Sequence, residues 1–454
     1  MKKKVLILSF FLLALISSVF LVNQTVHFLS KAKGMPANII VDASTNEGTI
    51  FPIWQALAQG GEEKYPFDNI LPEIANLQPK YIRIDHIYDF YNVVTKENGQ
   101  LKFKWDELDK VVGQILAVGA SPFLSLSYMP PAIAQNGDIV SPPEDWNEWA
   151  LVVKETIQHY SGKNQKNLFN VAYEVWNEPD LFGNWKIKGK KDYRILYKYA
   201  VIGATQAKNT NPFKIGGPSV TAPYKNWVDK FLDYIVDNKL RIDFYSWHRY
   251  SLEPKEFLED INKVDTWLFK NAGLTLEKYL TEWGPIPENS PLYDSDFVAA
   301  HLIATTKQLI QRADFIFTFE IKDGPLSENQ KYLSRGGILT YDSKKRPRYH
   351  ALELLNEMPG NRIRLEGEGS WVSGFAVRKD NVIKIILTNL DSTNQHFEVV
   401  PLSITNLENG NYFYQESFLR GTGKSSNETV VDNNLKREIP LTPNNIVVVE
   451  IRKT

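Results

Sequence analysis

Short runs of apolar and β-branched residues alternate with longer stretches of helical periodicity over most of the chain. Within 105–118, for example, Leu108, Val111, Val112 and Ile115 recur at intervals of three or four residues, which is typical of one buried helix face. Strands that are apolar on both faces and separated by helices indicate a parallel sheet covered by those helices. The predicted strands are 39–42, 80–85, 121–128, 171–177, 214–217, 242–248, 278–282 and 315–320. The predicted helices are 105–118, 146–160, 193–208, 227–238, 254–271, 295–312 and 348–358.

This alternation predicts an α/β fold, a (β/α)8 TIM barrel. An open, doubly wound sheet is the alternative. Such sheets usually carry a glycine-rich phosphate-binding turn after the first strand, and residues 41–46 contain no glycine.

The pattern changes after the Pro-Gly-Asn break at 359–361. The segments beyond it are strand-like and show no helical period, which predicts a small antiparallel β-sandwich domain following the barrel. These segments are 374–377, 382–389, 396–401, 412–418, 428–431 and 446–451. The predicted domains are an N-terminal segment at 1–34, a catalytic barrel at 35–358 and the β-sandwich at 359–454.

The N-terminal segment has the composition of an export signal. Three lysines follow Met1, and residues 5–22 then carry no charge. The uncharged run is just long enough to span a bilayer, so we favour an uncleaved membrane anchor, with a cleaved signal peptide as the alternative. Either interpretation places the body of the protein outside the cytoplasm, with the membrane contacted only through this segment.

Charge and composition exclude several classes of function. The net charge of −1 gives no electrostatic reason to bind nucleic acid or an anionic membrane surface. The absence of cysteine excludes disulfides, thiolate nucleophiles and cysteine–zinc sites. Seven histidines without metal-ligand spacing indicate neither a metal site nor a cofactor.

Two glutamates fall at the ends of predicted barrel strands. Pro179 directly follows Glu178 and ends its strand, because proline cannot donate to a strand ladder. Glu282 ends the seventh predicted strand. The carboxyl ends of barrel strands meet at one mouth, and two carboxylates across a pocket are what glycosidic cleavage requires. The predicted reaction is therefore hydrolysis of a glycosidic bond in a carbohydrate.

Polar residues next to this pair have both a functional and a structural interpretation. Asn177 could bind a sugar 2-hydroxyl or cap the strand end. Arg83 lies in an apolar strand, and a buried arginine needs a carboxylate partner. It could orient Glu282 or pair with Glu174, which we interpret as structural because it lies four residues deeper than Glu178.

The ends of the sixth and eighth strands supply further candidates. His248 is expected to contact sugar or to have a structural role, and Tyr250 to donate a hydrogen bond to Glu282. Glu320 could bind a substrate hydroxyl or form a salt bridge with Lys322.

Four tryptophans lie at or just beyond strand ends, where indole faces could stack on sugar rings. The alternative is packing between the barrel and its helices. We expect two or three of them to reach solvent. The four are Trp176, Trp185, Trp247 and Trp283, of which Trp185 and Trp283 are candidate substrate contacts.

The motif Tyr-Glu-Val-Trp-Asn-Glu-Pro-Asp at 173–180, together with Glu282, resembles glycoside hydrolase family 39, within the clan of (β/α)8 retaining glycosidases. The resemblance implies that Glu178 is the acid/base, that Glu282 is the nucleophile and that the reaction retains anomeric configuration. Members of the family include β-xylosidases, α-L-iduronidases and endo-acting enzymes on bacterial exopolysaccharides.

The chain departs from the family pattern at two strands that line the sugar subsites. The second strand often reads Arg-x-His in the family, whereas here Arg83 is followed two places later by Asp85 and then by His86. The eighth strand often carries Trp and Ser-Asp, whereas residues 318–323 read Thr-Phe-Glu-Ile-Lys-Asp. We therefore expect an extracytoplasmic retaining hydrolase of an envelope polysaccharide or exopolysaccharide rather than a xylosidase or an iduronidase. A non-catalytic carbohydrate-binding surface protein and a transglycosylase are the alternatives on the same scaffold.

Overall fold

The computed structural model describes residues 34–61, 63–272, 275–325 and 336–454. They form two compact units, one made of Thr49–Asn361 and one made of residues 34–48 together with Arg362–Thr454. The predicted signal or anchor at 5–22 lies outside the described residues. Within the described part of the chain, no helix combines the length and the apolar character needed to cross a membrane.

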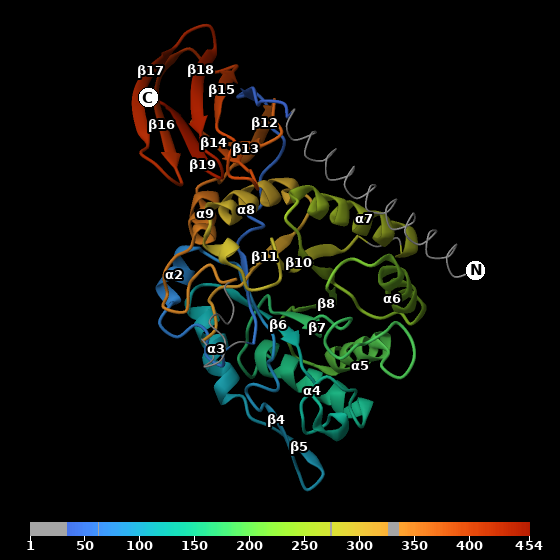
Figure 1. Cartoon of the computed structure of the whole chain (residues 1–454). Coiled ribbons are helices and arrows are strands. Elements are labelled where there is room, and N and C mark those ends of the chain that lie inside the picture. Colours follow the sequence, from blue (N-terminus) through green and yellow to red (C-terminus); the bar gives the residue numbers. More distant parts are fainter. Residues whose placement is uncertain (1–33, 62, 273–274, 326–335) are drawn as a thin grey trace, which may run out of the picture. The chain divides into compact units, whose positions relative to one another are not determined.

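The larger unit is a closed barrel of eight parallel strands in the order β2-β3-β6-β7-β8-β9-β10-β11, with helices around it (Figure 1). The TIM barrel prediction is confirmed. The strands are β2 (Ala56–Gln59), β3 (Tyr81–Ile84), β6 (Ser121–Leu126), β7 (Ala172–Val175), β8 (Lys214–Val220), β9 (Phe244–Tyr250), β10 (Glu277–Gly284) and β11 (Phe315–Phe319).

The predicted first strand of the barrel is wrong. Residues 39–42 form β1 (Ile39–Asp42), which pairs with two strands of the smaller unit. The barrel instead begins with Ala56-Leu57-Ala58-Gln59, all of them buried. Alanine and glutamine have weak strand propensity, so the sequence gives little local signal there, whereas the β-branched Ile39-Ile40-Val41 gives a strong one.

The barrel helices bury one apolar face each. In α3 the predicted residues Leu108, Val111, Val112 and Ile115 are buried. Aspartate side chains cap α4 and α5: Asp145 accepts from the N–H of Asn147 at 2.8 Å, and Asp192 accepts from that of Arg194 at 3.0 Å. The helices are α2 (Leu71–Asn76), α3 (Asp106–Ala117), α4 (Trp146–Ser161), α5 (Tyr193–Gln206), α6 (Lys225–Asp237), α7 (Pro254–Ala272), α8 (Asp296–Leu309) and α9 (Pro347–Asn356). A hairpin of β4 (Val94–Glu97) and β5 (Gln100–Phe103) was not predicted.

The inside of the barrel is layered by the two-residue period of its strands. Along β3, Tyr81 belongs to an apolar, largely aromatic layer and Arg83 lies one step further along the strand. The apolar layer consists of Ala56, Ala58, Tyr81, Phe123, Ala172, Phe244, Tyr279, Phe315 and Phe317. Arg83 pairs with Glu174 above this layer, so polarity rises toward the carboxyl ends of the strands.

The smaller unit is a nine-stranded sheet in the order β17-β16-β19-β14-β13-β12-β1-β15-β18. β1 pairs with β12 in antiparallel orientation and with β15 in parallel orientation. The pairs β13–β14, β14–β19, β15–β18, β16–β17 and β16–β19 are antiparallel. Strands from both ends of the sheet share one buried core, which includes Val430 of β17 and Ile439 of β18. The remaining strands are β12 (Asn361–Glu366), β13 (Val372–Lys379), β14 (Val382–Asn389), β15 (Glu398–Thr405), β16 (Gly410–Phe418), β17 (Lys424–Val430), β18 (Asn434–Leu441) and β19 (Ile446–Lys453).

Candidate active site

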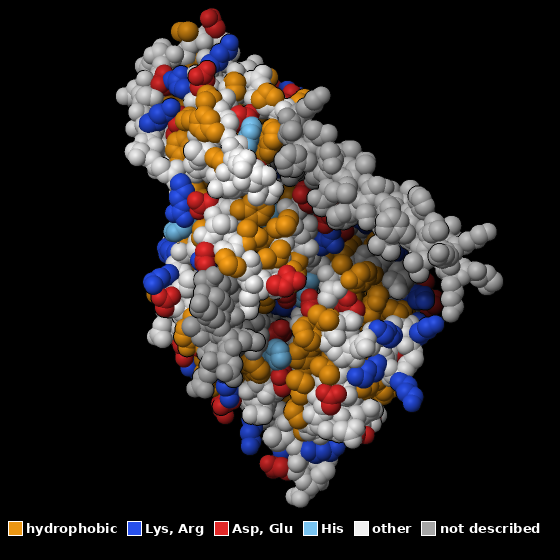
Figure 2. All heavy atoms as spheres, viewed as in Figure 1, with side chains coloured by type: hydrophobic (Ala, Val, Ile, Leu, Met, Phe, Trp, Pro, Cys, Tyr) orange, Lys and Arg blue, Asp and Glu red, His pale blue; other side chains and the backbone are white. Residues whose placement is uncertain are grey.

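A pocket of about 610 Å³ opens at the carboxyl ends of the barrel strands. This volume lies within the range of about 300–1,000 Å³ that is usual for small-molecule sites. Glu178 and Glu282 both line it, together with Asp85, His86 and Tyr128. On the face seen in Figure 2, acidic and basic side chains are interspersed rather than gathered by sign.

The backbone after β7 turns Glu178 into this pocket. The strand ends at Val175, and both Trp176 (φ 75°) and Glu178 (φ 43°) have left-handed backbone conformations. Residues other than glycine are strained in the left-handed region of backbone conformation, and strained residues cluster at functional sites. The N–H of Glu178 donates to the carbonyl of Ser219 at 3.0 Å, which ties the turn to the end of β8.

Glu282 lies within β10, where the pairing with β9 is irregular between Leu280 and Glu282. The phenol of Tyr250 donates to Oε1 of Glu282 at 2.6 Å, as predicted. Nη1 of Arg83 lies 3.9 Å from Oε2 of the same carboxylate. Glu282 is therefore held by a hydroxyl donor and a cation, both of which favour its ionised form.

His248 lies between the two glutamates. Its Nδ1 is 2.9 Å from Oε1 of Glu178 and 3.4 Å from Oε2 of Glu282. Its Nε2 is 2.9 Å from the hydroxyl of Ser219. Burial lowers the pKa of His248, and the charge of Glu282 opposes this effect.

Glu178, His248 and Glu282 could in principle also hold a cation, because one ligand atom from each lies within 4.8 Å of the others. The nitrogen of this group is hydrogen-bonded to Glu178, and Tyr250 occupies one oxygen of Glu282. The same atoms thus already take part in hydrogen bonds within the site.

The two carboxyl groups have raised pKa values. Burial raises the pKa of Glu178 to about 7, and the charge of Asp180 adds to the rise. Burial also raises the pKa of Glu282 to about 7, while His248 opposes the rise. When one member of such a pair ionises, the pKa of the other increases. Near neutral pH the pair can therefore hold one carboxylate and one carboxylic acid, and the hydrogen bond from Tyr250 favours the carboxylate at Glu282.

Arg83 combines both of its predicted roles. Its Nε donates to Oε2 of Glu174 at 2.7 Å, and its Nη2 donates to the side-chain oxygen of Asn177, also at 2.7 Å. The amide of Asn177 donates in turn to the phenol oxygen of Tyr128 at 3.0 Å. Burial acts to lower the pKa of Arg83, but the neighbouring carboxylates, first among them Glu174, raise it above its ordinary value. Arg83 stays charged and links the barrel interior to the pocket.

The other predicted polar residues divide into two groups. Asp85, His86, Asn177 and Tyr250 line the pocket, whereas Arg83 and His248 lie fully buried behind it. Burial raises the pKa of Asp85, and its Oδ1 accepts no hydrogen bond from the described residues.

The expected solvent exposure of the strand-end tryptophans is wrong. Trp176, Trp185, Trp247 and Trp283 are all fully buried, and none lines the pocket. Trp185 packs edge-on against Trp176 at 5.3 Å, and Trp283 packs edge-on against Phe257 of α7 at 5.6 Å. Large flat side chains fill the layer between strands and helices, which was the alternative interpretation.

Glu320 is also buried and does not line the pocket. Its Oε2 accepts a hydrogen bond from Gln59 at 3.3 Å. Lys322 pairs with Glu63 at 3.0 Å.

Several pocket residues were not predicted. Tyr128 is the last residue of the predicted strand 121–128, so its position at a strand end was a usable signal. Phe182 follows Glu178 by four residues. Ser219 gave no such signal, because its contact with His248 depends on a left-handed backbone (φ 56°) that a sequence pattern does not report.

The chain was compared with known families and proteins. The model of glycosyl hydrolases family 39 matches residues 38–406. The chain belongs to this family. As a member of glycosyl hydrolases family 39 it is a glycoside hydrolase.

Two characterised relatives are named β-xylosidases. The protein from Caldicellulosiruptor saccharolyticus is 25% identical over 341 residues, which cover 69% of this chain and 67% of the relative. The protein from Geobacillus stearothermophilus is 26% identical over 334 residues, which cover 64% and 63%. The chain thus spans about two thirds of the length of these relatives.

Solved structures agree in fold. The family 39 enzyme from Xanthomonas axonopodis pv. citri has a TM-score of 0.79 at 17% identity, covering 92% of this chain and 98% of that one. A monomeric β-xylosidase from Caulobacter crescentus has a TM-score of 0.77 at 18% identity, covering 92% and 99%.

Proposed function

We propose that this family 39 hydrolase cleaves a poly- or oligosaccharide outside the cytoplasm with retention of configuration, with Glu178 as acid/base and Glu282 as nucleophile. The observation that carries the proposal is the spacing of the pair: one oxygen of Glu178 lies within 4.8 Å of one oxygen of Glu282. Retaining glycosidases hold their carboxyl groups about 5–5.5 Å apart, whereas inverting ones need about 6.5–9.5 Å for a water.

In the first step a carboxylate oxygen of Glu282 attacks the anomeric carbon, while Glu178 gives its proton to the glycosidic oxygen. The bond from carbon to the leaving oxygen breaks, and a covalent glycosyl-enzyme forms. In the second step Glu178, now ionised, takes a proton from water, whose oxygen attacks the same carbon and releases Glu282. The raised pKa of Glu178, about 7, suits a group that gives and then takes a proton near neutral pH.

Asp85 and Asn177 are the residues we assign to sugar hydroxyls. Both line the pocket, and the buried Oδ1 of Asp85 accepts no hydrogen bond from the described chain. A hydroxyl donor from the substrate would satisfy it. The names of the two relatives make β-xylosides the first sugars to test, followed by β-glucosides and uronides.

Two variants test the assignment. Glu282→Gly should lose hydrolysis of an activated aryl glycoside by several orders of magnitude, and wild-type hydrolysis by this variant would show that the nucleophile is wrongly assigned. Glu178→Ala should lose activity on poor leaving groups, because no acid protonates the glycosidic oxygen. On an activated aryl glycoside, azide should accelerate its turnover by replacing the deprotonated water, giving a glycosyl azide of retained configuration. Proton NMR of the first anomer released by the wild-type enzyme reads retention directly.

The extracytoplasmic location rests on the three lysines and the uncharged run at 5–22. Fractionation of expressing cells, with N-terminal sequencing of the mature chain, tests it. Full-length chain in the membrane fraction supports an anchor, a shortened soluble chain outside the cytoplasm supports a cleaved signal, and a cytoplasmic chain contradicts both.

A further inference from the structure

Three large apolar side chains are exposed together at the edge of the active-site pocket. Leu181, Phe182 and Tyr224 all line it, and they are 60%, 41% and 44% exposed. Single exposed apolar residues are common, but a group of them beside a functional cleft marks a binding surface. The mechanism given above uses none of the three.

Phe182 is held in place by the loop that carries Glu178. Its N–H donates to the carbonyl of Glu178 at 2.7 Å, and its own carbonyl accepts from Nε1 of Trp176 at 3.1 Å. Its ring packs at an angle of 60° against Tyr128, with 5.8 Å between the ring centres. The ring is therefore positioned before a ligand arrives, although part of it stays open to solvent.

Tyr224 follows β8 and is connected by hydrogen bonds to the loop that carries Glu178. Its phenol oxygen is 3.0 Å from the hydroxyl of Thr221, whose N–H donates to Asp180 at 3.1 Å. Asp180 follows Glu178 by two residues. Glu178 and both exposed rings are thus connected through one short hydrogen-bonded segment, and ordering the rings on binding costs little entropy.

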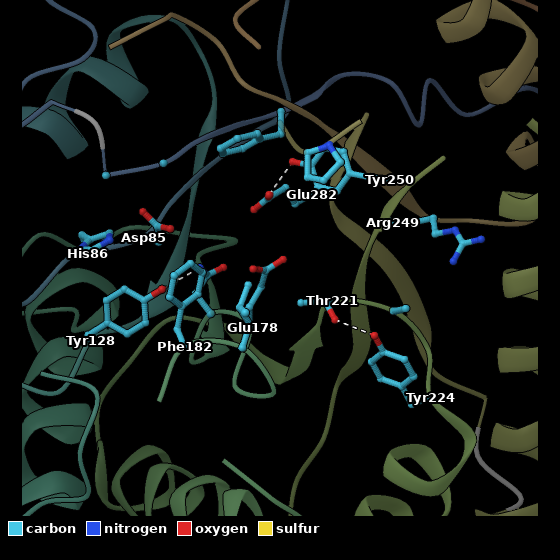
Figure 3. Close-up of a pocket in the computed structure, with 17 residues that line it drawn as sticks. Asp85, His86, Tyr128, Glu178, Phe182, Thr221, Tyr224, Arg249, Tyr250 and Glu282 are labelled. Carbon is cyan, nitrogen blue, oxygen red and sulfur yellow. Dashed lines mark hydrogen bonds between the residues drawn. The ribbon is translucent and has the colours of Figure 1, made fainter. Parts of the chain in front are cut away.

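The position of the rings relative to the acid indicates which part of a substrate they meet. Figure 3 shows Glu178 between Phe182 and the Thr221–Tyr224 pair, with Glu282 on the other side of the pocket. A general acid lies beside the oxygen of the leaving group, whereas the nucleophile lies beneath the sugar that is retained. The surface next to Glu178 therefore faces the leaving group.

We propose that Leu181, Phe182 and Tyr224 bind the leaving part of the substrate, and that this part is itself carbohydrate. The inference rests on the proposed function. Sugar rings present apolar C–H faces with hydroxyls around their edges, and exposed aromatic rings bind such faces. The substrate is therefore an oligo- or polysaccharide that continues beyond the cleaved bond, and the same surface holds an acceptor sugar when the glycosyl-enzyme is released.

The test compares two substrates that differ only in the leaving group. A panel of β-glycosyl fluorides of xylose, glucose and a uronic acid first identifies the sugar that is cleaved, and fluoride leaves without contacting a sugar surface. The β-linked di- and trisaccharides of that sugar then report the leaving-group site. The quantity measured is the ratio of kcat/KM for the oligosaccharide to kcat/KM for the fluoride.

We expect this ratio to fall about tenfold in Tyr224→Ala and in Phe182→Ala, as stacking contacts of this kind are lost. Tyr224→Phe keeps the ring and should keep the wild-type ratio, which separates stacking from the hydrogen bond to Thr221. Phe269→Ala is the matched control, because Phe269 is 77% exposed on α7 and does not line the pocket.

An unchanged ratio in both alanine variants, with their thermal unfolding intact, would overturn the leaving-group site and leave the catalytic pair untouched. Release of the inverted anomer by the wild-type enzyme would instead overturn the proposed retaining mechanism. If an alanine variant fails to fold, the release of a 2-fluoroglycosyl-enzyme by added acceptor sugar gives the second measurement, on Phe182→Leu and Tyr224→Leu. Loss of acceptor acceleration supports the site, and unchanged acceleration contradicts it.

Discussion

The phenol of Tyr250, at the end of β9, donates a 2.6 Å hydrogen bond to Oε1 of Glu282 on the neighbouring strand β10. A hydrogen bond to the ionised form of a carboxyl group lowers its pKa, and here it opposes the effect of burial. The strand pairing of the barrel thereby sets the charge state of the proposed nucleophile.

Tyr250→Phe should reduce kcat/KM by about 10- to 100-fold, the effect of one hydrogen bond to a charged group. Without the donor the pKa of Glu282 rises, so the acidic limb of the pH profile of kcat/KM should move to higher pH. Tyr173→Phe is the control, because its phenol contacts Ser161 and does not line the pocket. An unmoved acidic limb in Tyr250→Phe would contradict the role given to this bond.

Glu178→Gln should stabilise the fold at alkaline pH. The pKa of Glu178 is about 7 in the folded state and near 4.5 without the fold, so between these values the folded state binds more protons. Stability contributed by this group is present below pH 4.5 and lost as pH rises toward 7. The variant should gain about 3 kcal/mol at pH 8 and nothing at pH 4. Denaturant unfolding at both pH values, with the exposed Glu97→Gln as control, measures the difference.

The buried Arg83–Glu174 pair offers a prediction that separates stability from function. Arg83→Met leaves Glu174 charged and unpaired and should cost about 3–5 kcal/mol of unfolding free energy. Adding Glu174→Leu removes the unpaired charge and should recover much of that loss. Activity should stay low in the double variant, because Asn177 has lost its 2.7 Å donor. Recovery of both stability and kcat/KM would show that Arg83 has no positioning role.

Trp185→Ala should lower the free energy of unfolding. The side chain is fully buried against Trp176, so its removal should cost about 3–5 kcal/mol by cavity formation. Thermal unfolding measures this loss, and KM for an activated glycoside is the companion measurement. A large rise in KM without loss of stability would restore Trp185 as a direct sugar contact.

The barrel strands could be predicted where the residue pattern of a segment favours the strand that the fold requires there. Buried β-branched or aromatic strands such as Tyr81–Ile84 and Phe315–Phe319 were found, because burial on both faces produces a mostly apolar run. Ala56–Gln59 was missed, because alanine fits the crowded barrel interior without having a strand preference of its own. Ile39–Asp42 was identified as a strand but placed in the wrong sheet, since nothing in four residues specifies a partner distant in sequence.

The candidate site was predictable to the extent that strand ends converge. Glu178 and Glu282 could be paired from their positions alone, and Tyr250 followed from the adjacent strand. The tryptophans were misjudged because a strand-end position does not say whether a side chain points to the mouth or to the helices. Ser219 depends on a left-handed backbone within β8, and Phe182 on the turn after β7, neither of which a residue pattern determines.

Because β1 pairs with β15, the smaller unit cannot be formed by the C-terminal residues alone. Ile39 pairs with Leu402 and Asp42 with Thr405, so one inner strand comes from the part of the chain synthesised before the barrel. A fragment of 362–454 alone would lack β1 and expose the edges of β12 and β15 to pairing with other chains. Transplanting this unit would require residues 34–48 to be grafted on as well. During synthesis on the ribosome, β1 can pair with β12 and β15 only after nearly the whole chain has been made.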